Sequence, residues 1–362
     1  MSNFTTLPTP AILVDRAKLA TNIRSMQQAC DATGIELRPH MKTHKMVEVA
    51  RQQLAAGARG LTCAKVGEAE AMLPSGVQEI FIANSLVGRG LAPRLAALAE
   101  RLTDLRVALT SDAHFDALAD LAAATGRRLG VMLAVDTGLG REGVRSDEAA
   151  GRLAARLARH PHLELKGLYC HEGHFYGIPR DQVPAALETM IERLHRVRLA
   201  IDPALAIWPG CSVTARLATQ ISRGRVQAVR PGSYMFGDLS LCRTTGVMAP
   251  QDVAVHVLAT VVDRPEPGLA LIDAGSKTFS SDRTPDNVFG ATADGRDLNV
   301  MRVNEEHGYV SGADVDALRV GDRVAFVPAH ICTVINLTNE VTVTEGTTIT
   351  GRWTVEARGR TQ

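Results

Sequence analysis

The chain has 362 residues, and its 40 Lys and Arg almost cancel its 39 Asp and Glu. A balanced charge excludes the strong basic field that attracts nucleic acid or anionic lipid. No apolar run reaches the roughly 18 residues that span a membrane, and the first ten residues lack the basic and apolar stretches of a signal peptide. We therefore expect a cytoplasmic protein that acts on a small molecule and binds neither nucleic acid nor membrane.

Short β-rich runs alternate with longer amphipathic segments between residues 36 and 232. In chain order the β-rich runs are ELRPHM, GLTCAK, EIFIAN, LRVALT, GVMLAVD, LKGLYCH, LAIWPG and VQAVRPG. The segments between them, such as 44–56 and 147–160, carry apolar residues at helical spacing. This alternation predicts an α/β fold built on a parallel (β/α)8 barrel of the TIM type, whose active site lies at the carboxyl ends of the strands.

The pattern changes near residue 250 to β-branched and alternating runs without long helices. These runs are VAVHVLATVVDR, LALIDAG, DRVAFVPAHICTVINL, NEVTVTEG and TITGRWTVEAR. They predict a second, all-β domain at the C-terminus. We place the barrel domain at residues 10–245 and the β domain at residues 246–362, and leave open whether residues 1–9 join the β domain.

The segment RPHMKTHK, residues 38–45, concentrates basic side chains where the first barrel strand ends. Pro39 keeps the chain extended through Arg38, which places Lys42 at the mouth of the barrel beside the other basic residues. Neighbouring positive charge favours the neutral form of an amine, and a neutral amine can attack a carbonyl. The segment therefore indicates a lysine that forms a Schiff base, and the alternative is a solvated basic turn.

The segment VDTGLGREGV, residues 135–144, runs from a predicted strand into a glycine-rich loop that contains Arg141. Glycine allows a backbone to approach a ligand closely, and arginine can donate a hydrogen bond to a phenolate oxygen. The same pattern is typical of a tight loop between a strand and a helix, so both interpretations stay open.

The segment WPGCSVTAR, residues 208–216, offers Gly210, Ser212 and Thr214 where a strand should lead into a helix that begins near Val213. Backbone N–H groups and hydroxyls at a helix N-terminus bind phosphate well. The segment RPGSYMFGD follows the last barrel strand and could close the same site, because phosphate sites of this barrel usually follow strands 7 and 8.

The segment YCHEGHFYG, residues 169–177, places His171, Glu172, His174 and Tyr176 after the sixth barrel strand. This density of acidic and basic groups favours proton transfer. The alternative interpretation is a loop held together by its own hydrogen bonds.

The segment PAHICTVINL, residues 328–337, places His330 and Cys332 two positions apart on a predicted strand, so that both side chains would point to one face. An imidazole and a thiolate can bind one divalent ion, zinc first, and leave coordination positions open. The alternative is a buried cysteine beside a histidine that has its own hydrogen-bond partner. An acid–histidine turn, NEEHG at residues 304–308, belongs to the same domain.

Together these motifs resemble a family of pyridoxal-phosphate enzymes with the alanine-racemase-like fold, fold type III: the D-threonine aldolase and D-serine dehydratase group. The motifs occur in the order RPHMKTHK, DTGLGREGV, RPGSYMFGD, DAGSKTFSSD, EEHG and His-x-Cys, and the resemblance extends from TPAILVD to HICTVINL. It implies pyridoxal 5'-phosphate and a divalent metal, zinc or manganese, as cofactors. It also implies an amino acid substrate and a homodimer.

The resemblance assigns roles to individual residues. Lys42 would bond to pyridoxal phosphate and act as a catalytic base, Arg141 would lie near the phenolic oxygen, and His171 would be the second catalytic residue. The other implied cofactor-binding residues are Tyr176, Gly210, Ser212, Thr214, Gly232, Ser233 and Tyr234. His330 and Cys332 would bind the metal.

The implied reaction is lyase chemistry on a β-hydroxy D-amino acid. Aldolases of the group often carry His-x-Asp at the metal pair and dehydratases tend to carry His-x-Cys, so Cys332 favours β-elimination, as in dehydratases of D-serine or 3-hydroxy-D-aspartate. Retro-aldol cleavage to glycine and an aldehyde is the first alternative. A racemase that needs no metal and a non-catalytic protein that only binds the cofactor are the others.

Overall fold

The computed structural model describes residues 4–362, which divide by packing into two units. The barrel unit comprises Ser25–Lys42, Val47–Gly232 and Arg360–Gln362, and the β unit comprises the described chain up to Arg24, Thr43–Met46 and Ser233–Gly359. These units are defined by contacts, and each of them contains several separate segments of the chain. They do not test the predicted domain boundaries, which stay at residues 10–245 and 246–362 as a prediction. No helix within the described residues is long and apolar enough to cross a membrane.

The barrel unit contains a parallel sheet in which β3 to β8 follow one another in chain order, and β9 pairs in parallel with β2. Its strands are β2 (Glu36–Leu37), β3 (Leu61–Cys63), β4 (Glu79–Ile82), β5 (Asp104–Leu109), β6 (Leu129–Ala134), β7 (Leu163–Tyr169), β8 (Ala206–Trp208) and β9 (Ala228–Val229). A parallel bridge between His40 and Thr62 connects the end of β2 to β3. The backbone N–H of Gln227 donates to the carbonyl of Ile207 at 3.1 Å, which joins β9 to β8. The predicted barrel strands and the α/β fold class are confirmed.

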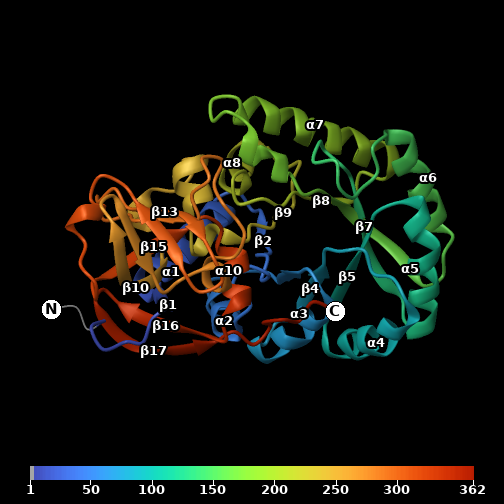
Figure 1. Ribbon diagram of the computed structural model, residues 1–362. Helices are drawn as coiled ribbons and strands as arrows, with labels where there is room; N and C mark the ends of the chain where they lie inside the picture. The colour runs from blue at the N-terminus through green and yellow to red at the C-terminus, as the bar shows by residue number, and fades with distance from the viewer. Residues whose placement is uncertain (1–3) are drawn as a thin grey trace. The chain divides into compact units, whose positions relative to one another are not determined.

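Helices connect these strands and lie along the outside of the sheet, as Figure 1 shows for α4 to α7. The helices are α2 (Val47–Ala55), α3 (Val66–Met72), α4 (Ala92–Arg101), α5 (Asp112–Thr125), α6 (Asp147–Ala158), α7 (Val183–Ile201) and α8 (Ala215–Ile221). A further helix, α1 (Arg16–Asp31), precedes β2, and its residues up to Arg24 belong to the β unit. Ser111 and Ser146 begin α5 and α6 by accepting backbone N–H bonds from His114 and Ala149. Helix α8 begins two residues later than predicted, after Thr214.

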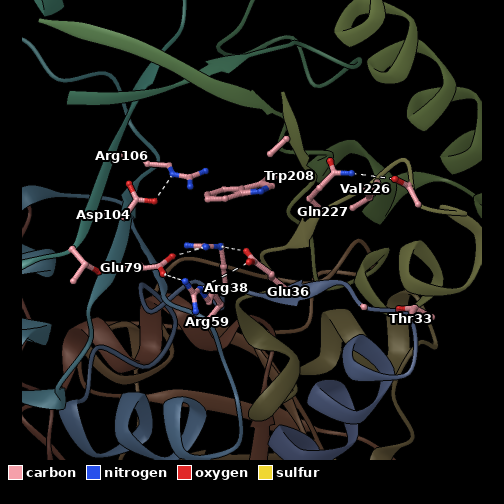
Figure 2. A pocket seen from close by; sticks show the side chains of 14 residues that line it. Thr33, Glu36, Arg38, Arg59, Glu79, Asp104, Arg106, Trp208, Val226 and Gln227 are labelled. Carbon is pink, nitrogen blue, oxygen red and sulfur yellow. Dashed lines mark hydrogen bonds and ion pairs between the residues drawn. The ribbon is translucent and has the colours of Figure 1, made fainter. Parts of the chain in front are cut away.

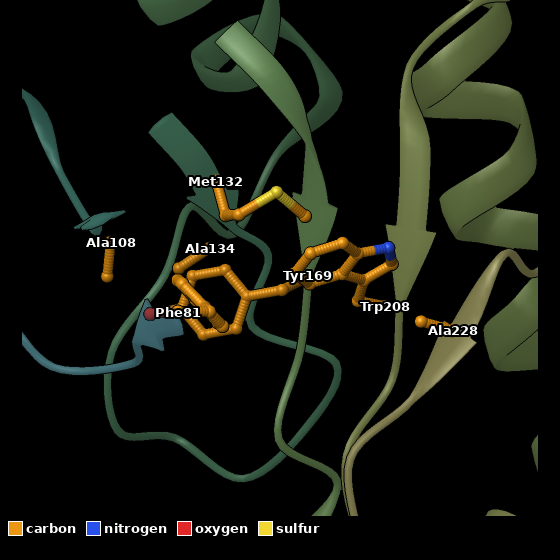
Figure 3. Packing of buried hydrophobic residues seen from close by; sticks show 7 residues of the cluster. All are labelled: Phe81, Ala108, Met132, Ala134, Tyr169, Trp208 and Ala228. Atoms are coloured by element: carbon orange, nitrogen blue, oxygen red, sulfur yellow. The ribbon is translucent and has the colours of Figure 1, made fainter. Parts of the chain in front are cut away.

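Large side chains fill the interior of the barrel. Figure 3 shows the cluster, which consists of Phe81, Ala108, Met132, Ala134, Tyr169, Trp208 and Ala228. The ring of Phe81 packs edge-on against Tyr169 and Trp208, with centroids 4.9 and 5.8 Å apart. A filled interior leaves the ends of the strands as the places where a small molecule can bind.

The β unit is built on one sheet with the strand order β11-β14-β13-β12-β15-β10-β1-β16-β17. Its strands are β1 (Ala11–Asp15), β10 (Val255–Glu266), β11 (Leu269–Ile272), β12 (Gly290–Ala291), β13 (Asn299–Val303), β14 (Gly308–Ser311), β15 (Arg323–Pro328), β16 (Glu340–Glu345) and β17 (Thr348–Thr354). Strand β10 pairs with both β15 and β11, so the strands from β10 to β15 close into a ring. Strand β1 inserts between β10 and β16, which gives the N-terminal segment a place in this unit.

The sequence predicted an all-β domain here, but the structure also contains two short helices, α9 (Ser276–Phe279) and α10 (Ile331–Leu337). The run predicted as a strand through residue 337 ends as β15 at Pro328, and His330 is the extended N-cap of α10. Ile331, Val334 and Ile335 are buried at helical spacing, and a short apolar run of this kind fits strand and helix equally well. His330 and Cys332 therefore do not share a strand face, and that part of the prediction was wrong.

Candidate active site

The predicted catalytic residues of the barrel unit lie near the carboxyl ends of its strands. Lys42 follows β2, Arg141 lies between β6 and α6, and His171 follows β7. The charges of Lys42 and Arg141 both act on the imidazole of His171, so the fold brings side chains from three distant parts of the sequence within electrostatic range of one another. This is the end of the barrel at which the sequence predicts the site.

The surroundings of His171 keep its imidazole neutral. Burial lowers the pKa of His171 first, and the charges of Lys42, Arg141 and Arg230 add to the effect, so that the pKa falls to about 3. The Nδ1 atom lies 2.5 Å from the carbonyl oxygen of Gly210. Because a carbonyl can only accept, Nδ1 carries the proton and Nε2 is the basic nitrogen.

Glu172 organises the loop that follows β8. Its carboxylate is fully buried and accepts hydrogen bonds from the backbone N–H of Gly210 at 3.1 Å and from the hydroxyl of Thr214 at 2.6 Å. The hydroxyl of Thr214 therefore donates to Glu172 and does not cap α8. The cofactor-binding role of Thr214 stays a prediction.

Gly210 lies against the buried guanidinium of Arg230, and a Cβ atom there would come within 2.6 Å of Arg230 Nη2. Arg230 donates to the carbonyls of Cys170 at 2.5 Å and Trp208 at 3.2 Å. Burial lowers the pKa of this arginine. A glycine is thus required for β8 and β9 to approach each other at this end, and a cation lies directly beneath the loop.

The remaining predicted cofactor residues fall in both units. The backbone N–H of Gly232 donates to Ser212 Oγ at 3.1 Å, so these two loops meet in the barrel unit. Tyr176 lies in a 3₁₀ turn, Gly173–Gly177, that follows β7. Ser233 and Tyr234 are buried in the β unit, in the 3₁₀ turn Ser233–Met235.

Arg38 and Lys45 were expected to lie beside Lys42, but both side chains bond to other groups. The guanidinium of Arg38 donates to Glu36 at 2.8 Å and to Glu79 at 2.6 Å, at the amino ends of the strands. Lys45 belongs to the β unit, where its amine donates to the carbonyl of Ala357 at 3.4 Å. The guanidinium of Arg38 is paired with carboxylates at the amino ends of the strands, so the expectation that Arg38 supports Lys42 is wrong.

The β unit brings His330 and Cys332 close together, although they flank the start of a helix. The charge of Cys332 raises the pKa of His330 most, a hydrogen bond to Asp238 adds to this and burial opposes it, and the pKa is about 11. The hydroxyl of Thr43 lies 3.1 Å from Cys332 Sγ. Within the described residues no group of three His, Cys, Asp or Glu side chains is placed to hold a metal, so this pair would leave coordination positions open.

A cavity of about 690 Å³ opens at the amino ends of the barrel strands. Figure 2 shows its charged lining, where Arg38 bonds to Glu36 and Glu79. The guanidinium carbons of Arg38 and Arg106 lie 4.4 and 4.5 Å from the ring centroid of Trp208, on which both stack. These cations are neutralised by neighbouring carboxylates, and none of the predicted site residues lines the cavity. Its position favours a role in stability.

Comparison with known proteins agrees with this geometry. Residues 14–240 match the family described as alanine racemase, N-terminal domain, and residues 254–344 match the putative serine dehydratase domain. The chain is 34% identical to D-threo-3-hydroxyaspartate dehydratase of Delftia sp. (strain HT23), with 90% of this chain and 91% of that protein covered. It is 30% identical to D-threonine aldolase of Arthrobacter sp, with 97% and 93% covered.

The chain belongs to the D-threonine aldolase and D-serine dehydratase family of pyridoxal-phosphate lyases. Solved structures agree. D-threonine aldolase from Filomicrobium marinum matches with a TM-score of 0.85 and 27% identity, over 99% of this chain and 98% of that chain. The Delftia dehydratase matches with a TM-score of 0.85 and 30% identity, over 98% and 99%. A variant of that dehydratase is described as being in the metal-free form.

The residues of this lyase suit the cofactors of its family. Pyridoxal phosphate is anionic and bonds to a primary amine, and the barrel end offers Lys42 together with the positive charges of Arg141 and Arg230. A divalent ion such as zinc prefers imidazole and thiolate ligands, which His330 and Cys332 provide. The two donor sets have opposite charge, as the two cofactors do.

From the sequence, Glu172 was expected among the acidic and basic groups after the sixth barrel strand, and Arg230 and Asp238 were assigned no role, although all three shape the site of this lyase. Glu172 and Arg230 are buried beneath the loop after β8, and Asp238 is buried beside His330. All three lie within motifs already quoted. The charged side chains in these motifs were a signal, because charged residues are seldom buried without a partner. A motif alone does not show which of its residues are buried.

Proposed function

We propose that this lyase acts on β-hydroxy D-amino acids by β-elimination, releasing ammonia and a 2-oxo acid. The observation that carries the proposal is the metal pair: a thiol, Cys332, stands next to His330 in the β unit. The 34% identity to a D-threo-3-hydroxyaspartate dehydratase supports the same reaction.

The residues of the barrel end would bind the cofactor and transfer the α-proton. Bound pyridoxal phosphate supplies an electron sink for the α-carbon of the substrate. Lys42 provides the amine that holds this group and that accepts the α-proton. Arg141 and Arg230 contribute positive charge that favours an anionic ligand. Burial first, and then the charges of Lys42 and these arginines, keep His171 neutral, with its lone pair on Nε2.

The residues of the β unit would prepare the leaving group. His330 and Cys332 would hold a divalent ion, which lowers the pKa of a hydroxyl bound to it and makes that hydroxyl easier to expel. Thr43 would donate its hydroxyl hydrogen to the Cys332 thiolate. Metal and cofactor thus contribute at different carbons of the substrate, the β-carbon and the α-carbon.

The deciding experiment is product analysis. The purified protein is supplied with pyridoxal phosphate and zinc or manganese, and is incubated with D-threonine or 3-hydroxy-D-aspartate. Elimination yields ammonia with 2-oxobutanoate or oxaloacetate. Glycine with acetaldehyde or glyoxylate would show that the bond between Cα and Cβ breaks, and would overturn the proposal.

Retro-aldol cleavage is the second candidate. The 30% identity to a D-threonine aldolase over 97% of this chain favours it. A racemase would turn over without metal, and a non-catalytic binding protein would not turn over at all. Loss of activity when the metal is removed by a chelator would therefore support a lyase reaction and exclude both the racemase and the non-catalytic protein.

We also propose a cytoplasmic homodimer that binds neither nucleic acid nor membranes. The near-neutral charge balance supports the absence of nucleic acid partners. Light scattering of the holoenzyme tests the dimer, and a molar mass near that of one chain would refute it.

A further inference from the structure

We propose that Asp238 is a positioning residue of the metal site, which holds the Nδ1–H group of His330 so that Nε2 is the nitrogen that binds the divalent ion. The inference rests on the proposed metal role of His330 and Cys332. It adds a residue that is remote in the sequence and that contacts neither the substrate nor the metal.

The carboxylate of Asp238 is fixed on both sides by the backbone. It is fully buried, and Oδ1 accepts a hydrogen bond from the N–H of Leu241 at 3.0 Å. Oδ2 accepts from the N–H of Ile331 at 3.2 Å and lies 3.0 Å from Nδ1 of His330. One oxygen therefore ties the carboxylate to its own turn, and the other ties it to the start of α10.

The geometry decides which nitrogen of His330 carries a proton. A carboxylate only accepts hydrogen bonds, so Nδ1 must donate to Asp238. Binding of a divalent ion displaces the other ring proton, and the lone pair that binds the ion is then on Nε2. A carboxylate behind a ligating histidine also fixes the orientation of the ring.

The second ligand has a comparable partner. Cys332 lies in the first turn of α10, and the hydroxyl of Thr43 is 3.1 Å from its sulfur. A thiolate accepts the hydroxyl hydrogen, so Thr43 supports the charged form that binds the ion. Each ligand of the pair thus has a polar neighbour, Asp238 or Thr43, within the β unit.

The competing interpretation makes Asp238 a third metal ligand. Its oxygens already accept from two backbone N–H groups and from the imidazole of His330. Within residues 4–362 no group of three His, Cys, Asp or Glu side chains is arranged to hold a metal. The carboxylate therefore faces the back of the ligand.

The first test is a crystal structure of the wild-type holoenzyme loaded with zinc. We expect zinc on Nε2 of His330 at about 2.0–2.1 Å, with Nδ1 still bonded to Asp238. Zinc on Nδ1, or zinc bound by the Asp238 carboxylate, would overturn the inference. This test needs no variant, so it holds even if a change at Asp238 prevents folding.

The second test compares Asp238→Asn with a matched control, Asp282→Asn. The Asp282 carboxylate also lies near α10, where it accepts from the hydroxyl of Thr333 at 2.7 Å and has no bond to His330. Zinc affinity of each holoenzyme is measured by competition with a chelator at fixed pH, and the visible spectrum and thermal midpoint report on cofactor binding and folding.

We expect Asp238→Asn to weaken zinc binding by about 10–100-fold while cofactor binding is retained, because a neutral amide accepts from Nδ1–H more weakly than a carboxylate and its NH2 group must face the backbone N–H of Leu241 or Ile331. Asp282→Asn should stay within about twofold of wild type. Asp238→Asn with wild-type zinc affinity would overturn the inference alone. A wild-type protein that binds no zinc or manganese would remove the metal from the proposed function, and this inference with it.

Discussion

His171 in the barrel unit and His330 in the β unit have opposite surroundings. Each presents Nδ1 to an oxygen acceptor, yet the pKa of His171 is lowered to about 3 and that of His330 is raised to about 11. Burial and three cations lower the pKa of His171, whereas the charge of Cys332 and the hydrogen bond to Asp238 raise the pKa of His330. Strongly shifted pKa values of this kind mark candidate functional sites. The barrel end therefore suits an anionic cofactor, and the β unit suits a cation.

Removing the amine at the cationic site is expected to have the largest effect. Lys42→Ala should abolish the visible absorbance of bound pyridoxal phosphate and lower kcat by about 10⁴-fold or more, because in the proposed function the same amine holds the cofactor and moves the proton. Spectra and rates of the reconstituted protein measure both. Lys166→Ala is the control, since that lysine pairs with Glu164 on β7. An unchanged spectrum for Lys42→Ala would refute its assignment.

Removing the thiol at the anionic site should leave the cofactor in place. Cys332→Ala is expected to lower the rate by about 10³-fold at low metal, and excess zinc or manganese should restore part of it. The visible spectrum should match that of wild type. Cys242→Ala, which changes another half-buried cysteine of the β unit, should keep full activity. A Cys332→Ala enzyme with a normal rate would show that the pair does not bind the catalytic metal.

The sequence led to candidate residues for these sites, but not to the residues that support them. Lys42 and His171 could be located because they follow β-rich runs, and the ends of parallel strands meet in a barrel. His330 and Cys332 were identified by residue type, but their helix start was not, since the apolar run around them fits either structure. Asp238 lies 92 positions from His330, and such a pairing appears only when the chain is folded.

A charge cluster in which every charge is paired should stabilise the fold without taking part in the reaction. Glu79, at the amino end of the barrel, binds Arg38 at 2.6 Å and Arg59 at 2.6 Å. Glu79→Gln leaves the buried guanidinium of Arg38 with weaker compensation and should cost about 3 kcal/mol of stability. Urea denaturation followed by tryptophan fluorescence measures this loss, and kcat should stay near wild type. A large fall in kcat with unchanged stability would place function at this end.

The smallest effect should appear in the pH dependence of stability. An unfolded histidine has a pKa near 6.5, whereas burial and neighbouring cations lower that of His171 to about 3, so the unfolded state binds more protons between these values. Stability from this group is therefore complete above pH 6.5 and is lost as the pH falls towards 3.

Replacing this imidazole by a side chain that does not titrate should remove that dependence. When the pH falls from 7 to 5, the free energy of unfolding of wild type should decrease by up to about 2 kcal/mol more than that of His171→Gln, as measured by urea denaturation. His256→Gln should show an effect of the same sign and nearly the same size over this range, because burial and the charge of Lys18 lower the pKa of His256 to about 4, which is also below pH 5. If His171→Gln kept the full dependence of wild type, the neutral imidazole at the barrel end would be refuted, and the contrast with His330 would disappear.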